Sequence, residues 1–312
     1  MKKNLWVKLI SVILIVASMV TLVACDSKED ESDSNSDSDV NNAFIGVRAE
    51  DLTPSENLTF TLTTDRKGYQ LKSASKCNDE QIVIPSSYTG TDGKSLPVTA
   101  IASGAFKDNK SAVTVYIPDS VTKILGGKTG AFEDAKSLTT VVCGSGITEI
   151  GTRAFADCAE LKKIQLNEGI KKIGGYAFAG CGNLETITIP DSVNDLGEAC
   201  FQRCAKMTSV TLGKGLKKAS YTPDTKDPKT GKVTKMGDYK SGFGRFTFYF
   251  CKNISTIKYT GTVAEWKKID IDVSCFLSTT MTSVVICSDG KVELPKLDGQ
   301  NTLPQELVDS FN

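Results

Sequence analysis

The side chains most able to do chemistry in this 312-residue chain are its ten cysteines and its carboxylates, because the chain has no histidine. Without histidine, general acid-base catalysis near neutral pH, catalytic triads and most catalytic zinc sites lose their usual residue. The sequence also lacks a Gly-x-Ser-x-Gly elbow and a phosphate-binding loop. A glycosidase needs only two carboxylates, yet pairs such as Asp191 and Asp195 fall in turn positions of a repeat. We therefore expect no catalytic residue and no cofactor.

The cysteines follow the spacing of a repeat. Cys158, Cys181 and Cys204 come at 23-residue intervals, and Cys251 takes the equivalent position after an insertion. Free cysteine packs as a small apolar residue, so we expect a column of buried thiols. Disulfides are the alternative, because stacked positions about 5 Å apart lie within disulfide range, although parallel side-chain directions disfavour them. A straight row of sulfurs is not a tetrahedral metal site, and we expect no metal.

The frame that positions these cysteines is a unit of 23 residues. Each unit has an opening Ile, a Phe five residues later, a Cys or small polar residue, and then Leu-x-x-Ile-x-Ile. The final alternation is typical of a strand with one buried face, and a unit this short must bury that face against the next copy. Units open at Ile101, Ile124, Ile150, Ile173, Leu196 and Phe243. The aligned aromatic residues, expected to form one buried column, are Phe106, Phe132, Phe155, Phe178, Phe201 and Phe248.

Residues 173–195, "IGGYAFAGCGNLETITIPDSVND", show the frame in full. They resemble the motif IPxSVTxIGxxAFxxCxxLTxVT of the BspA-like, Treponema-type leucine-rich repeats of bacterial surface proteins. The resemblance extends over about residues 58–289. It implies a right-handed leucine-rich-repeat solenoid, with a β-strand plus a short helical or irregular segment in each coil. We expect about seven coils over residues 101–289, interrupted by an inserted loop at residues 219–242.

The segments that flank the array are expected to close its ends. Residues 44–100 include "LTFTLTT" and "QIVIPSSY", which alternate like strands separated by turn residues. An open solenoid edge exposes unpaired backbone, so we expect a small antiparallel β cap there. Residues 290–312 are expected either to cap the last coil or to fray.

The first 25 residues have the pattern of an export signal. Three lysines flank or precede an apolar core at residues 9–23, which is too short for an ordinary membrane-spanning helix. The sequence "LVAC" that ends at Cys25 resembles the lipobox of bacterial lipoproteins, which implies a diacylglyceryl group on Cys25. An ordinary signal peptide with a chance cysteine is the alternative. We expect an exported protein, lipid-anchored at the bacterial cell membrane and facing outward.

Residues 26–43 read as a polar tether. Residues 26–39 hold seven carboxylates and one lysine, and no apolar residue occurs before Val40. Such a segment cannot bury enough surface to offset the entropy of ordering, so we expect it to be disordered and solvated. Calcium binding is the alternative, but the regular ligand spacing and central glycine of a calcium loop are absent.

Two surfaces are candidates for recognition. The outward positions of successive strands line up in a candidate binding face made of Tyr116, Gln165, Thr188, Thr211 and Lys258. The inserted loop mixes aromatic and basic residues suited to an anionic glycan or protein, namely Tyr221, Lys226, Lys229, Lys232, Lys235 and Tyr239. Each has a plainer explanation: the strand preference of threonine for the face, and a tolerated insertion for the loop.

Charge and resemblance together lead to one functional expectation. The chain has 37 basic and 37 acidic side chains, so its formal net charge is zero and no basic field favours nucleic acid. We expect a monomeric, membrane-anchored surface protein that binds a protein or glycan ligand, adhesin-like and without catalysis. A carbohydrate-active enzyme or glycan-capturing accessory lipoprotein is one alternative. A purely structural envelope protein is the other.

Overall fold

Inter-residue contacts divide the chain into residues 1–43 and residues 44–312, and every described residue belongs to the second part. The predicted signal segment and tether therefore lie outside the described residues. The computed structural model describes residues 48–222, 225–226, 228, 233–235, 239–269, 271, 273–276 and 284–294.

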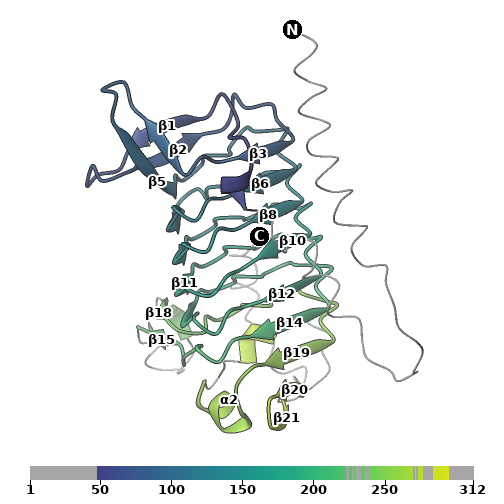
Figure 1. Cartoon of the computed structure of the whole chain (residues 1–312). Coiled ribbons are helices and arrows are strands. Elements are labelled where there is room, and N and C mark those ends of the chain that lie inside the picture. The colour runs from purple at the N-terminus through teal and green to yellow at the C-terminus, as the bar shows by residue number, and fades with distance from the viewer. Residues whose placement is uncertain are drawn as a thin grey trace, which may run out of the picture. The chain divides into compact units, whose positions relative to one another are not determined.

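The longer strand of each coil comes from the Leu-x-x-Ile-x-Ile segment. Its alternation places Ile187 and Ile189 in the interior while Thr186 and Thr188 stay exposed. Neighbouring coils pair in parallel along two sheets, which lie beside one another between β10 and β12 (Figure 1). The first sheet contains β3 (Gln81–Val83), β6 (Thr114–Tyr116), β8 (Thr140–Val142) and β10 (Lys163–Gln165). The second contains β12 (Thr186–Thr188), β14 (Ser209–Leu212), β19 (Thr256–Tyr259), β20 (Val284–Cys287) and β21 (Gly290–Glu293).

A further ladder of short strands forms where each unit opens. The opening isoleucines are fully buried and pair in register, Ile124 with Ile150 and Ile150 with Ile173. Together with the N-terminal strands they make an eight-stranded sheet. Its strands are β1 (Thr59–Leu62), β2 (Tyr69–Ser73), β4 (Ser87–Thr89), β5 (Ser95–Ile101), β7 (Lys123–Ile124), β9 (Glu149–Ile150), β11 (Lys172–Ile173) and β13 (Asp195–Leu196).

The phenylalanines of successive coils stack in one column along the interior. Their ring centroids are 4.2, 4.8, 5.2, 5.3 and 5.7 Å apart from Phe106 to Phe248, and neighbouring rings are tilted by 20° or less. All six are buried, with at most 1% of their surface exposed. Aromatic pairs at this separation contribute about 1 kcal/mol beyond the burial of their area. The column therefore joins each coil to the next as well as filling the core.

The segment that carries each phenylalanine is a chain of turns without a helix. Tyr176 and Gly180, on either side of Phe178, have φ angles of 57° and 74°. Left-handed residues interrupt the hydrogen-bond pattern of a helix, and aspartate and glycine accept this conformation more readily than bulky residues. Asp108, Asp134 and Asp157 fill the position of Gly180 in the earlier coils and also have positive φ.

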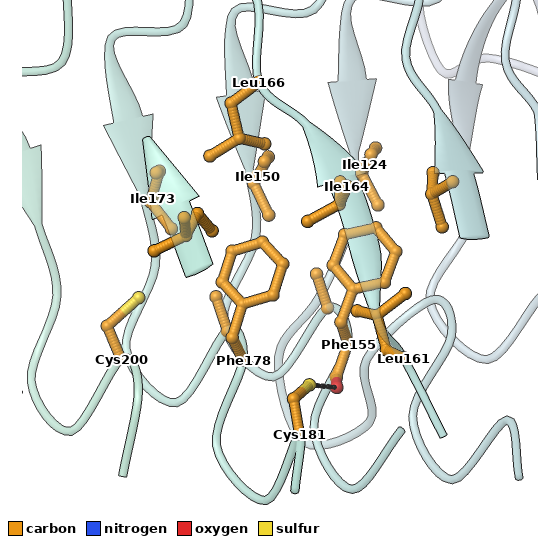
Figure 2. Close-up of a cluster of buried hydrophobic side chains, with 14 of the residues drawn as sticks. Ile124, Ile150, Phe155, Leu161, Ile164, Leu166, Ile173, Phe178, Cys181 and Cys200 are labelled. Atoms are coloured by element: carbon orange, nitrogen blue, oxygen red, sulfur yellow. Dashed lines mark hydrogen bonds between the residues drawn. The ribbon is translucent and has the colours of Figure 1, made fainter. Parts of the chain in front are cut away.

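The thiol column has a hydrogen-bonding role. The Sγ of Cys181 donates to the carbonyl oxygen of Phe155 in the preceding coil, at 3.2 Å (Figure 2). Cys158, Cys204 and Cys251 make the same contact to the phenylalanine of the coil before each of them, at 3.0, 3.2 and 2.9 Å. Each of these carbonyls also accepts from the backbone N–H three residues further along its own chain, so the thiol supplies a second, weak donor to the same oxygen.

Asn109 occupies the cysteine position in the first repeat unit. Its side chain forms hydrogen bonds with backbone groups at the N-terminal end of the interior. Its Nδ2 donates to the carbonyl oxygens of Ala74 and Cys77 at 2.8 and 2.9 Å. Its Oδ1 accepts from the N–H groups of Ser111 and Ala112. The amide is thus fully paired with backbone groups, two of which belong to the segment of Ala74 and Cys77 before the first repeat unit.

The N-terminal region is only partly the antiparallel cap that the sequence predicts. β1 pairs antiparallel with β2, and β4 with β5, as expected. β2 and β3, however, pair in parallel with β5 and β6 and so belong to the coil ladder. The residues "QIVIP" from Gln81 repeat the frame of "TITIP" from Thr186, which explains the difference.

The C-terminal end closes with a different coil. A helix, α2 (Val263–Ile269), replaces the short opening strand and buries Trp266 against Tyr259, with ring centroids 5.2 Å apart. Thr262 and Glu265 form a capping box, in which each side chain accepts from the backbone N–H of the other. Two 3-10 segments, η2 (Ala49–Asp51) and η3 (Val273–Phe276), complete the helical elements of the described residues.

The insertion contains antiparallel pairs where the sequence predicts a loop. Its strands are β15 (Ser220–Tyr221), β16 (Thr225–Lys226), β17 (Val233–Lys235) and β18 (Tyr239–Ser241). β15 pairs with β18 and β16 with β17. The stack continues past it, because the N–H of Leu196 donates to Gly242 and the N–H of Gly244 donates to Leu196, each at 2.7 Å.

Candidate binding surface

The outward side chains of β6, β8, β10, β12, β14 and β19 make up a surface that we call the strand face. Within each of the two sheets, the strand register places them in two columns. One column contains Thr114, Thr140, Lys163, Thr186, Ser209 and Thr256. The other contains Tyr116, Val142 and Gln165 in the first sheet and Thr188, Thr211 and Lys258 in the second, so the predicted face residues share equivalent positions within each sheet.

Hydroxyl groups on the strand face differ from those in the turns. The turn residues Thr139 and Thr208 donate to the carbonyl oxygens of Val113 and Glu185 in the coil before each of them. Thr186, Thr188 and Thr211 make no side-chain hydrogen bond to another described residue. The strand face thus presents hydroxyl groups that the fold itself does not use, and each can both donate and accept.

The rest of the strand face is neutral or weakly basic. Lys163 and Gln165 are exposed in β10, and Lys258 is half-buried in β19. Tyr116 is also half-buried, and burial raises the pKa of its hydroxyl. Protonated at neutral pH, Tyr116 adds an aromatic surface with a hydrogen-bonding end.

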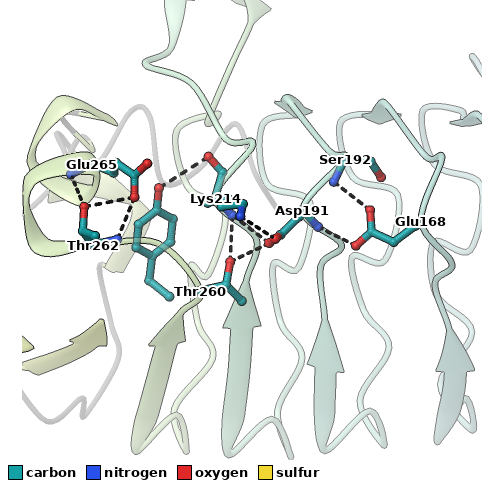
Figure 3. Close-up of polar contacts among 8 residues, drawn as sticks. Glu168, Asp191, Ser192, Lys214, Thr260, Thr262 and Glu265 are labelled. Atoms are coloured by element: carbon teal, nitrogen blue, oxygen red, sulfur yellow. Dashed lines mark hydrogen bonds and ion pairs between the residues drawn. The ribbon is translucent and has the colours of Figure 1, made fainter. Parts of the chain in front are cut away.

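A ladder of carboxylates follows the strands at their C-terminal ends, and the repeat pattern did not predict its function. Glu168 accepts from the N–H groups of Asp191 and Ser192 in the next coil, both at 3.0 Å (Figure 3). Asp191 in turn accepts from the N–H of Lys214 at 3.1 Å and from the hydroxyl of Thr260 at 2.5 Å. The Thr260 hydrogen bond is the main cause of a lowered pKa at Asp191. These acids hold the turns of successive coils together.

The structure gives Asp191 and Asp195 separate partners. Asp195, in β13, accepts from the N–H of Gly242 at 3.2 Å and pairs with the Nζ of Lys172 at 3.4 Å. It also receives a short hydrogen bond from the hydroxyl of Tyr239. Each carboxylate is therefore engaged in joining elements of the fold. Asp191 lies in a turn as the repeat predicts, whereas Asp195 is a buried residue of β13, because its position pairs with the opening strand of the preceding coil.

The two tyrosines of the inserted segment hold its base. The Tyr221 hydroxyl accepts from the N–H of Arg245 at 2.5 Å, and the Arg245 guanidinium lies 4.0 Å from the centre of its ring. The Tyr239 hydroxyl lies 2.8 Å from the carbonyl oxygen of Gly242 in addition to Asp195. Both hydroxyls are thus used internally, which differs from the ligand-contacting function considered for them. Lys226 and Lys235 belong to β16 and β17, whereas Lys229 and Lys232 lie outside the described residues.

The cysteines of the described residues are chemically protected. All nine are free thiols and buried: Cys77, Cys143, Cys158, Cys181, Cys200, Cys204, Cys251, Cys275 and Cys287. Burial raises the pKa of Cys143 and Cys158 to about 12. Because the thiolate is the reactive form, these groups are poor nucleophiles and poor metal ligands near neutral pH. In the described part of the chain, no three cysteine or acidic side chains gather in a geometry suited to a metal ion.

The proposed lipid attachment residue, Cys25, and the acidic tether lie outside the described residues. Among the helices that the structure does describe, none combines the length and apolarity needed to cross a bilayer.

Comparison with known proteins agrees with the repeat frame. Residues 99–222 match the BspA type leucine rich repeat region, in six copies. Residues 99–222 are thus a BspA-type leucine-rich repeat region. The family match starts at Thr99 and ends within the insertion, so the coils after the insertion extend the array beyond it.

Solved structures of bacterial leucine-rich repeat proteins are similar to this chain. A leucine-rich repeat protein of T. pallidum is 27% identical, with a TM-score of 0.51, over 66% of this chain and 84% of the other. A leucine-rich cell surface protein of Faecalibacterium prausnitzii is 26% identical, with a TM-score of 0.50, over 66% of this chain and 54% of the other. The chain thus spans about half the length of the Faecalibacterium protein. No curated protein sequence matches the chain.

Proposed function

We propose that this protein is a bacterial surface protein that binds a macromolecular ligand, adhesin-like, through the strand face and without catalysis. The observation that carries the proposal is the set of in-register hydroxyl groups that the fold leaves unengaged on the strand face. A rigid parallel stack holds these groups at intervals of about 4.8 Å, so many weak contacts can add up along one ligand. The BspA-type repeats at residues 99–222 and the similarity to a leucine-rich cell surface protein of Faecalibacterium prausnitzii support a location at the cell surface.

The test compares ligand binding by two variants of the full chain. Thr188→Glu combined with Thr211→Glu places bulky negative charges in the middle of the strand face. Thr152→Glu is the control, because Thr152 is exposed like Thr188 but belongs to the turn that leads to Phe155. Binding to immobilised extracellular-matrix proteins and to a glycan array should fall at least about tenfold for the double variant and stay unchanged for the control. Equal binding by both variants would place the site elsewhere, and cleavage of any glycan would contradict a binding-only function.

We also propose that Cys25 carries the membrane anchor. The support is the sequence pattern of a basic segment, a short apolar core and "LVAC" in register. Cells that express the chain should attach an alkyne-labelled fatty acid to the protein. The labelled protein should be recovered in the membrane fraction. Cys25→Ala should abolish the label, whereas Cys143→Ala, a buried-thiol control, should keep it. Labelling of the Cys25→Ala variant would exclude this anchor.

A further inference from the structure

The strand edges of the described residues are protected to different degrees. At β3, Ser55 covers the edge: its N–H donates to the Val83 carbonyl at 2.9 Å, and its Oγ accepts from the Val83 N–H at 3.1 Å. β21 carries the exposed charges of Lys291 and Glu293, which disfavour pairing with another strand. β1, the terminal strand of the eight-stranded sheet, has the uncharged sequence Thr-Phe-Thr-Leu and contains no proline. It lacks these common protections of an edge.

The register of the β1–β2 pair shows which backbone groups of β1 are available. The N–H of Thr63 donates to the carbonyl of Gly68 at 2.9 Å, and Leu62 lies opposite Tyr69. Hydrogen-bonded and non-hydrogen-bonded pairs alternate along an antiparallel ladder. Thr61 therefore bonds to Gln70 on β2, while the N–H and C=O groups of Phe60 and Leu62 point to the free edge. Neither residue makes a backbone hydrogen bond elsewhere in the described part of the chain.

The side chains of these two residues form an apolar strip on one face of β1. Phe60 stacks on Tyr88 of β4 with ring centroids 4.5 Å apart. Leu62, two residues further along the strand, shares that face. Leu62 is 42% exposed, and the only other large hydrophobic residue described as exposed is Ile286, at 41%, on β20. β4 is also an edge strand, but its exposed residues, Ser87 and Thr89, are both polar.

We propose that β1 pairs antiparallel with β1 of a second copy of this chain, so that two solenoids join through their N-terminal sheets. A two-fold axis at Thr61 sets Phe60 opposite Leu62 of the second copy, and Leu62 opposite Phe60 of the second copy. The two residues with free backbone groups then exchange four N–H···O=C bonds across the axis. The exposed Leu62 side chain packs beside the phenyl ring of the other copy, a favourable cross-strand pair.

The strand favours a second copy of itself over a different partner for two reasons. It carries no charge, so bringing two copies together causes no like-charge repulsion within the strand. The two-fold register also covers the exposed leucine with a residue that the same strand supplies, and isologous pairing of this kind closes at a dimer. A contact through one short strand is small, so the dimer should depend on concentration. This inference replaces the monomer expected from the sequence and is independent of the strand face.

The first experiment measures the association of the full chain by sedimentation across a hundredfold range of concentration, in one detergent throughout. Leu62→Lys places a flexible cation on each side of the axis and removes the leucine contact. It should raise the dimer dissociation constant by about tenfold or more. Ile286→Lys is the matched control, because Ile286 has almost the same exposure at the other end of the array, and it should leave the constant unchanged.

The second experiment tests the register with a cysteine. Thr61 meets Thr61 of the second copy in a non-hydrogen-bonded pair, in which α-carbons are about 4.5 Å apart and a disulfide can form. Thr61→Cys should give a reducible dimer on a non-reducing gel, and Thr89→Cys, on the edge of β4, should not. A chain that stays monomeric at every concentration would overturn the proposal. So would equal effects of the two lysine variants, or equal cross-linking by the two cysteine variants.

Discussion

Truncation of Phe178 to alanine should weaken the stack at its centre more than the same change at its end. Phe178 is fully buried between Phe155 and Phe201, with ring centroids 5.2 and 5.3 Å away. Phe106 is also buried but has one stacked neighbour, Phe132 at 4.2 Å. Removal of a buried phenylalanine side chain costs about 3–5 kcal/mol in lost transfer energy and cavity formation. Each stacked ring adds about 1 kcal/mol.

The expected loss of unfolding free energy is therefore about 5–7 kcal/mol for Phe178→Ala and about 4–6 kcal/mol for Phe106→Ala, a difference of about 1 kcal/mol. Urea denaturation followed by far-ultraviolet circular dichroism measures both values. The stability of a repeat array is close to a sum of unit and interface contributions. The central variant, which weakens two interfaces, should also broaden the transition. A loss below about 1 kcal/mol at Phe178, or a larger loss at Phe106, would refute the view that the column joins the coils.

Four further outcomes follow from the described contacts. Asp191→Asn should lower the free energy of unfolding, measured in urea, by about 1 kcal/mol. The pKa of Asp191 is lower in the folded state than in the unfolded state. The stabilisation by this carboxylate is therefore present above the unfolded pKa and should disappear as the pH falls through the folded pKa. Asn109→Ala should cost about 2–3 kcal/mol, since it removes the side-chain partner of the Cys77 carbonyl and of the Ser111 and Ala112 N–H groups, and a loss near zero would contradict the pairing. A thiol reagent at pH 8 should leave the nine described cysteines unmodified in the native chain and react with them in urea; rapid native labelling would show that they are accessible. Replacing residues 222–238 with a two-residue Asn-Gly turn between Tyr221 and Tyr239 should leave the urea midpoint unchanged, because the stack is continuous beneath the hairpin; unfolding of the deletion variant would show that the hairpin is part of the core.

The 23-residue repeat predicted those parts of the fold in which the same residue type recurs at the same position of every unit. Phe155, Phe178 and Phe201 recur every 23 residues, so their stacking could be expected before any contact was known. The cysteine positions followed for the same reason. Apolar residues are informative here because the coils share one interior, in which equivalent side chains stack on one another.

Elements that depend on contacts between coils had weaker signals. A strand of two residues such as Lys172–Ile173 is defined by pairing with the coils on both sides, and two residues carry no alternation to detect. The partner of the Glu168 carboxylate is set by the turn of the next coil that packs against it, and the sequence around Glu168 does not indicate that contact. The helix at Val263–Ile269 had a readable signal in the capping box from Thr262 to Glu265, but the repeat frame suggested another coil opening there.

The equivalence of the opening strands bears on how the protein can change in length. Ile124, Ile150 and Ile173 make the same pairing to the coil on either side. Deletion of residues 150–172 would set Ile173 over Ile124 and leave every remaining unit with the type of neighbour it already has. Recombination between repeats of one gene can therefore add or remove whole units without disturbing the rest, and the outward surface can evolve in increments of a single strand.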